Sequence, residues 1–210
     1  MTTTDGTATR RSRARRGEGE RLREDILRAA ERLLLETGDA DAVSIRAVAD
    51  AVGVTPPSIY LHFTDKTELI FQVCQEQWQR FDDYLKAAVG GIDDPVEWLE
   101  TAGHAYIEWG RDNPELYRIL FMSKPRETPP NVDKQAVITS GVFGDVLAVT
   151  ARAIEAGQLV GDPAVVAPSV WAAAHGVTSL LISVPDMPWP DVEQLTGYVL
   201  DRALQRPASA

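Results

Sequence analysis

The side chains best suited to polar recognition lie close together in the segment VGVTPPSIYLHF, residues 52–63. Ser58, Tyr60 and His62 offer two hydroxyls and an imidazole, groups that can bond to phosphate oxygens and to base edges. Lys66 follows at the start of the next expected helix, whose first backbone N–H groups also attract an anion. This combination predicts a nucleic-acid contact rather than a catalytic centre.

Sequence motifs typical of enzymes are missing. The chain has no G-x-S-x-G, no Walker-type glycine loop and no H-E-x-x-H. His104 and Glu108 could share a metal ion at helical spacing, but two ligands without a third make a poor site. The acid pair at 82–83 is expected to be solvated, and the pair at 93–94 is expected to lie at the start of a helix. We therefore expect no enzymatic activity, no metal and no cofactor.

Cys74 is the single cysteine of the chain, which excludes an internal disulfide and suggests a reducing, cytoplasmic setting. We expect a small buried hydrophobe at this position, with a redox-sensing thiol as the alternative. The longest apolar run, residues 165–182, is short for a membrane span and is interrupted by polar side chains. It predicts a buried or interfacial helix, and no membrane partner.

Charge is distributed unevenly along the 210 residues, whose net charge is −10. Residues 1–23 carry seven arginines against three acidic side chains, a net of +4. Residues 1–66 hold 11 basic and 11 acidic side chains, whereas residues 67–210 hold 10 and 20. Residues 1–17 therefore read as a disordered basic arm that adds contacts to DNA. An inert solvated tail is the alternative.

Helical periodicity continues through the rest of the chain, and no strand or internal repeat is evident. We expect helices at about residues 18–37, 45–52, 56–63, 65–89, 94–112, 113–122, 132–156, 163–183 and 191–205. The expected fold is all-α, with about nine helices. A helix-turn-helix domain at residues 18–66 would precede a larger helical domain at residues 67–210.

Gly53 marks the corner between two short helices. Glycine tolerates the left-handed conformation that such a corner needs, and a helix-turn-helix places its second helix in the DNA major groove. Pro56 and Pro57 stiffen the first turn of this second helix, where a missing N–H costs nothing. The prolines leave few donors for base edges, so DNA shape and thymine methyl groups are expected to contribute to recognition.

The segment SIRAVADAVGVTPPSIYLHFTDKTEL resembles the DNA-binding domain of the tetracycline-repressor (TetR) family of bacterial regulators. The shared elements are a Gly-Val corner, a Tyr-x-His-Phe and a Lys-x-x-Leu, here at residues 53–54, 60–63 and 66–69. The resemblance implies a double-stranded DNA operator bound by a homodimer. It implies that Ser44 and Arg46 contact the DNA backbone at the start of their helix. Thr55, Pro57 and Ser58 would face bases. Tyr60, His62 and Lys66 would lie near phosphates.

The C-terminal part resembles, more loosely, one subclass of these regulators. WAAAHGVTSLLI carries a Trp-x-x-x-His-Gly signature, and YIEWGRDNPELYRILF looks like the helix-break-helix of the same subclass. This resemblance implies a small-molecule effector and dimerisation through the helices at about 163–183 and 191–205. A repressor is the expectation. An activator, or a helical interaction module that has lost its ligand response or its DNA binding, is the alternative.

Aromatic side chains of the C-terminal domain are the candidates for effector contacts. Most aromatics fill cores, yet helical ligand pockets are lined by such side chains, and two or three are expected to touch the effector. His175 could instead be paired inside the core or an interface. The acidic, arginine-poor domain favours a largely apolar effector. The candidates are Trp78, Tyr106, Trp109, Phe121, Phe143, Trp171 and His175.

Overall fold

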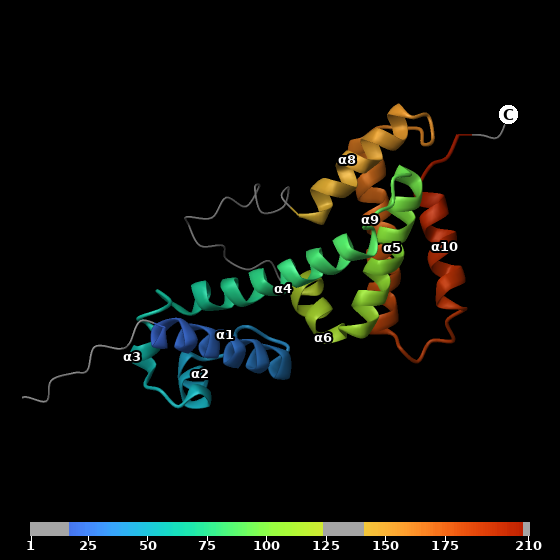
Figure 1. Ribbon diagram of the computed structural model, residues 1–210. Coiled ribbons are helices and arrows are strands. Elements are labelled where there is room, and N and C mark those ends of the chain that lie inside the picture. Colours follow the sequence, from blue (N-terminus) through green and yellow to red (C-terminus); the bar gives the residue numbers. More distant parts are fainter. Residues whose placement is uncertain (1–16, 124–140, 208–210) are drawn as a thin grey trace, which may run out of the picture.

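The computed structural model describes residues 17–123 and 141–207, and within these two ranges all regular structure is helical (Figure 1). The elements are α1 (Glu18–Thr37), α2 (Ile45–Val52), α3 (Pro56–Ile59), α4 (Lys66–Ala88), α5 (Pro95–Asp112), α6 (Pro114–Tyr117), the π-helix η1 (Arg118–Met122), α8 (Val142–Glu155), α9 (Pro163–Ser183) and α10 (Val192–Ala203). The expected all-α fold of about nine helices is confirmed. Residues 1–16 of the basic arm and the beginning of the helix expected from residue 132 lie outside the described residues.

The N-terminal domain is formed by α1, α2 and α3 around one apolar core with the first half of α4. Ser44 caps α2 by accepting a hydrogen bond from the backbone N–H of Ala47 at 3.1 Å. Gly53 ends α2 in the left-handed region, with φ 78°, and turns the chain toward α3. Ile59 and Phe63 are fully buried and fix the second helix of the pair against the core.

The long helix α4 belongs to both halves of the molecule, as Figure 1 shows. Asp65 caps its first turn by accepting from the N–H of Glu68 at 2.8 Å. Leu69 and Val73 are buried in the N-terminal core, whereas Phe81 and Leu85 are buried in the C-terminal core. One rigid element therefore connects the two cores.

The C-terminal domain packs α5 against α8, α9 and α10. Two glycines of α5 allow the closest approaches. A Cβ atom at Gly103 would lie 2.6 Å from Leu200 of α10, and one at Gly110 would lie 2.2 Å from Thr178 of α9. At both positions a side chain of the neighbouring helix therefore packs directly against the backbone of α5. These contacts fix the inner walls of the domain.

The segment expected as one helix at residues 113–122 is divided into α6 and the π-helix η1. The guanidinium of Arg118 donates to the carbonyl of Ile182 at 3.0 Å, and the hydroxyl of Ser123 donates to the carbonyl of Ile119 at 2.6 Å. Ile119 is buried in the N-terminal core, and the partly buried Leu120 packs against both cores. A short π-helix, a form often found at functional positions, thus lies where the two domains meet.

Helix α9 is the one element in the described ranges that is long and apolar enough to cross a membrane by length and composition. It is the central helix of the C-terminal domain and contacts α5, α8 and α10. Its buried face includes Val166, Val170 and Ala174. These contacts agree with a core helix, as the sequence predicts.

Candidate DNA-binding surface and effector cavity

Helix α3 presents the polar side chains that the sequence singles out. Thr55 occupies the N-cap position, but its hydroxyl lies 3.1 Å from the hydroxyl of Ser58 instead of capping the helix backbone. Pro57 is exposed in the first turn, and Tyr60 at the C-terminal end is 54% exposed. The two prolines and the hydroxyl pair give this short helix a preformed, solvent-facing end.

The remaining candidates for DNA contacts lie around α3. Arg46 extends into solvent from α2, with a long ion pair of 3.9 Å to Asp50. His62 is half-buried, and the ammonium of Lys66 donates to the carbonyl of Asp41 at 2.9 Å. Lys66 therefore also holds the loop in front of α2, a role that its position in the sequence does not reveal.

Two residues of this region have positions that sequence reasoning did not anticipate. Leu61 is 82% exposed beside Tyr60, so its apolar side chain is part of the solvent-facing surface next to α3. Arg23, counted with the basic N-terminal stretch, is directed into the domain. Its guanidinium lies 5.3 Å from the centre of the Phe63 ring and donates to the side chain of Gln72. Arg23 thus connects α1 to the segment between α3 and α4, through Phe63, and to α4 itself, through Gln72.

A cavity of about 610 Å³ lies in the C-terminal domain between α4, α5, η1, α8 and α9. Its size falls within the range of small-molecule sites. Five of the seven candidates line it: Trp78, Tyr106, Phe121, Phe143 and Trp171. Phe121 is at the centre of the aromatic cluster, with ring centres 4.7 Å from Trp78 and 4.7 Å from Tyr117.

Trp109 and His175 do not line the cavity. Trp109 is buried behind it, with its ring centre 4.7 Å from that of Phe81, which does line the wall. Nδ1 of His175 lies 2.6 Å from the hydroxyl of Tyr117 and 3.3 Å from that of Tyr106. Burial lowers the pKa of His175, which favours its neutral form.

The polar atoms of Tyr106 and Trp171 are directed at each other rather than at the cavity. The indole N–H of Trp171 donates to the hydroxyl of Tyr106 at 3.3 Å, and that hydroxyl lies 3.0 Å from the hydroxyl of Tyr117. Burial raises the pKa of Tyr106 above its ordinary value, and it raises the pKa of Tyr117 to about 12. Both phenols are therefore neutral, and the ring of Tyr106 is part of the apolar wall of the cavity.

Asp82 is the important lining residue that the sequence did not predict. The acid pair 82–83 was expected to be solvated, which is correct for Asp83 and wrong for Asp82, which is 9% exposed. Its carboxylate is stabilised by two donors, the backbone N–H of Val142 at 2.7 Å and the ammonium of Lys86 at 2.6 Å. Asp82 of α4 thereby caps the first turn of α8 across the cavity.

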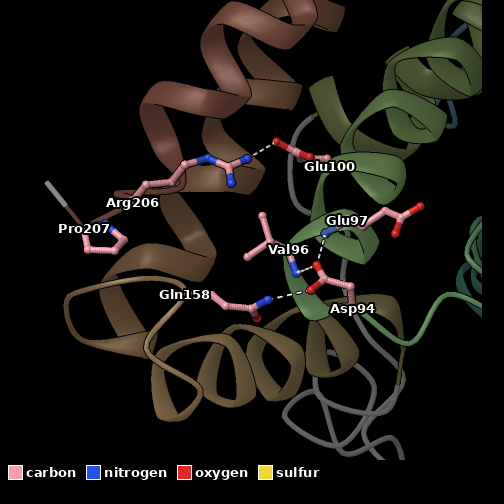
Figure 2. Close-up of a pocket in the computed structure, with 7 residues that line it drawn as sticks. All are labelled: Asp94, Val96, Glu97, Glu100, Gln158, Arg206 and Pro207. Carbon is pink, nitrogen blue, oxygen red and sulfur yellow. Dashed lines mark hydrogen bonds and ion pairs between the residues drawn. The ribbon is translucent and has the colours of Figure 1, made fainter. Parts of the chain in front are cut away.

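A second hollow lies at the far end of the same domain and is polar (Figure 2). Asp94 caps α5, as the sequence predicts, by accepting from the N–H of Val96 and of Glu97. Its other oxygen accepts from Gln158 at 2.5 Å, while Arg206 pairs with Glu100. These contacts tie the first turns of α5 to the segments that follow α8 and α10.

Within the described ranges, no group of three or more His, Cys, Asp or Glu side chains is close enough to hold a metal ion. Cys74 is buried in the N-terminal core. The cavity and the helix-turn-helix surface are therefore the two candidate functional sites in these ranges.

Sequence profiles of known families match both halves of the chain. One described as bacterial regulatory proteins of the tetR family matches residues 26–73, and one described as a tetracyclin repressor-like C-terminal domain matches residues 99–202. The HTH-type transcriptional activator FasR of Mycolicibacterium smegmatis is 26% identical over 125 residues. That match spans 60% of this chain and 56% of the length of FasR.

Solved structures with the same fold cover nearly the whole chain. FadR of Bacillus subtilis, solved in complex with stearoyl-CoA, has a TM-score of 0.69 at 15% identity, over 86% of this chain and 97% of that one. SmeT, repressor of a Stenotrophomonas maltophilia multidrug efflux pump, has a TM-score of 0.66 at 24% identity, covering 87% and 88%. A Rhodococcus sp. RHA1 protein of unknown function has a TM-score of 0.72 at 21% identity, covering 87% and 93%. Since the two profiles together span most of its length, the chain belongs to the TetR family, a family of bacterial transcription regulators rather than enzymes.

Proposed function

We propose that the protein is a cytoplasmic, ligand-responsive transcription regulator that binds a pseudo-palindromic DNA operator as a homodimer. The observation that carries this proposal is the connection of two sites by one helix. The surface of α3 lies at one end of α4, and the aromatic cavity lies along the other half of the same helix. An effector in the cavity can therefore act on the position of the DNA-binding surface.

The contacts with DNA divide into two kinds. Ser58, Thr55 and Pro57 face the base edges in the major groove, where thymine methyl groups can pack against the proline. Tyr60 and Arg46 bind phosphates and position the domain on the duplex. His62 and Lys66, both half-buried, contribute from the edge of the surface. Contacts with the DNA backbone would supply affinity for the duplex, while sequence specificity would depend partly on DNA shape.

The dimer forms through α9 and α10. Large apolar side chains are exposed on these helices in the single chain, among them Val165, Leu180 and Tyr198. Burying such side chains is the usual driving force of an obligate interface. A dimer would place two α3 helices in successive major grooves, about 34–36 Å apart, on a pseudo-palindrome. This assignment follows the resemblance to the subclass with the Trp-x-x-x-His-Gly signature.

The ligand response requires only a modest free energy. A 100-fold loss of operator affinity requires the effector to favour the non-binding conformation by about 2.7 kcal/mol. A well-packed apolar ligand in an aromatic cavity can supply that amount. Repression is the expected sign of regulation. Activation is the second candidate, since the relative from Mycolicibacterium smegmatis is named an activator.

The experiment is a selection of duplexes from a random-sequence DNA library, followed by binding measurements on the enriched site. We expect an inverted repeat, bound by a dimer. Tyr60→Phe removes one hydroxyl from the proposed surface and should weaken binding about tenfold, or about 1.4 kcal/mol. Tyr84→Phe, which removes one hydroxyl from a half-exposed position on α4, is the matched control and should change nothing. Failure to enrich any sequence would contradict the proposal.

A further inference from the structure

The described walls of the cavity divide into a broad aromatic part and one polar edge. Six aromatic rings form the first part: Trp78, Phe81, Tyr106, Phe121, Phe143 and Trp171. The polar edge consists of Gln75, Gln79 and Asp82, all from α4. Gln75 and Gln79 are exposed at the rim, whereas Asp82 is nearly buried. In these described walls, a ligand that fills the cavity would therefore meet one charged side chain, a carboxylate.

The charge at this edge is negative. The ammonium of Lys86 lies 2.6 Å from Asp82 and 3.9 Å from Asp145, so two carboxylates share one cation. The hydrogen bond to Asp82 raises the pKa of Lys86, which keeps the amine protonated. The backbone N–H of Val142 occupies one position on Oδ1 of Asp82. A carboxylate has about four lone-pair positions, so Asp82 retains capacity for a further donor.

Cations that could hold an anionic head group are missing from the same walls. Among the described lining residues, none is lysine, arginine or histidine. A carboxylate placed beside Asp82 would be repelled in surroundings of low polarity. An amine or hydroxyl would instead donate to Asp82, and aromatic faces favour a cation beside them.

We propose that the effector is a lipophilic molecule that carries a hydrogen-bond donor without negative charge, an amine or a hydroxyl, which binds Asp82. Its apolar body lies among the six rings. This assignment rests on the proposed function of the cavity and names its ligand class. It differs from an acyl carboxylate or an acyl thioester with a phosphate-bearing head group. Because Asp82 also holds the first amide of α8, the donor acts on the contact between α4 and α8.

The test compares three probes that share a ten-carbon chain and differ only in the head group: decylamine, 1-decanol and decanoate. Binding to the full-length protein is measured by calorimetry below the aggregation limit of each probe, at pH 7.4. We expect decylamine and 1-decanol to bind at least tenfold more tightly than decanoate. Asp82→Asn keeps the size and one acceptor oxygen but removes the charge, and it should reduce the preference for decylamine over decanoate to less than threefold. Asp83→Asn, on the exposed face, should keep the preference of the original chain.

Each outcome of this experiment tests a different part of the proposal. Decanoate binding as tightly as 1-decanol would overturn the ligand class and leave the cavity as a ligand site. An unchanged preference in a folded Asp82→Asn protein would overturn the role of Asp82. If that variant does not fold, the order of the three probes on the original chain still decides the ligand class. Binding of none of the probes would overturn this inference together with the effector part of the proposed function, whereas operator selection tests DNA binding independently.

Discussion

The hydroxyl of Tyr117 and Nδ1 of His175 lie 2.6 Å apart, and they join α6 to α9 inside the C-terminal domain. One arrangement satisfies the whole network: Trp171 donates to Tyr106, Tyr106 donates to Tyr117, and Tyr117 donates to Nδ1. It requires a neutral imidazole with its proton on Nε2, in agreement with the lowered pKa of His175. The network thus supports the aromatic wall of the cavity from behind.

Tyr117→Phe should destabilise the protein, because it leaves Nδ1 of His175 without its shortest hydrogen bond in a partly buried position. The expected loss is about 1–3 kcal/mol of unfolding free energy. Urea unfolding at fixed protein concentration, followed by circular dichroism, measures it. Tyr84→Phe removes a hydroxyl from a half-exposed position and should stay within about 0.5 kcal/mol of the original chain. Equal stability of the two variants would show that the network contributes nothing.

The neutral state of His175 also predicts a pH dependence. Its pKa in the folded chain lies below the ordinary value of 6.5, so the unfolded chain takes up a proton first as the pH falls. The contribution of the neutral ring to the free energy of unfolding is therefore complete above about pH 6.5, and it is lost progressively as the pH falls below that value. Urea midpoints between pH 8 and pH 5 should fall less steeply for His175→Gln, which retains an acceptor for Tyr117 but does not titrate. Parallel curves for the two proteins would contradict this assignment.

Gly110→Ala should disturb the contact between α5 and α9. The added methyl group would lie 2.2 Å from Cγ2 of Thr178 and 2.9 Å from Tyr117, so the helices must separate. Overpacking of this kind costs about 1–3 kcal/mol. Thr178→Ser removes the nearest methyl group, and the double variant should recover part of the loss, as a double-mutant cycle of unfolding free energies would show. Strictly additive losses would mean that the two residues do not meet.

Local signals in the sequence predict the N-terminal half well. Ser44, Gly53 and Asp65 each end or begin a helix at the expected position, because capping depends on residues adjacent in the chain. The exposed polar positions of α3 follow from the same short-range pattern. The contact of Arg23 with Phe63 could not be predicted, because it depends on how α1 packs against the segment that follows α3.

The cavity was predicted in its aromatic part and missed at its polar edge. Aromatic residues at helical spacing indicate a wall, whereas the burial of Asp82 depends on Val142, which is 60 residues away. Helical spacing places Asp82 nearer than Asp83 to the buried stripe of α4, but nothing within α4 indicates that its carboxylate binds the first amide of α8. The π-helix at residues 118–122 was missed for a similar reason, since Arg118 is held by the carbonyl of Ile182 on α9. Long-range partners decide these features.

Leu180 provides a direct test of the proposed dimer. It is 50% exposed on α9, a helix whose other faces contact α5, α8 and α10, so its exposed face has no partner within the described part of the chain. Leu180→Glu would place a charge in the proposed interface, where burial without a partner is costly. We expect sedimentation velocity to show monomers for this variant and dimers for the original chain, together with loss of operator binding.

Val160→Glu is the matched control, because Val160 is similarly exposed but lies in the loop between α8 and α9. It should remain dimeric and bind the operator normally. A monomeric Leu180→Glu protein, by contrast, presents a single α3 to the duplex. Its operator affinity should therefore fall toward that of one half-site, even though the helix-turn-helix itself is intact. A dimeric Leu180→Glu protein would show that the exposed face of α9 lies outside the interface, and Tyr198 on α10 would then be the next candidate for an interface residue. A monomer that retains full operator affinity would instead contradict recognition of a pseudo-palindrome by two subunits.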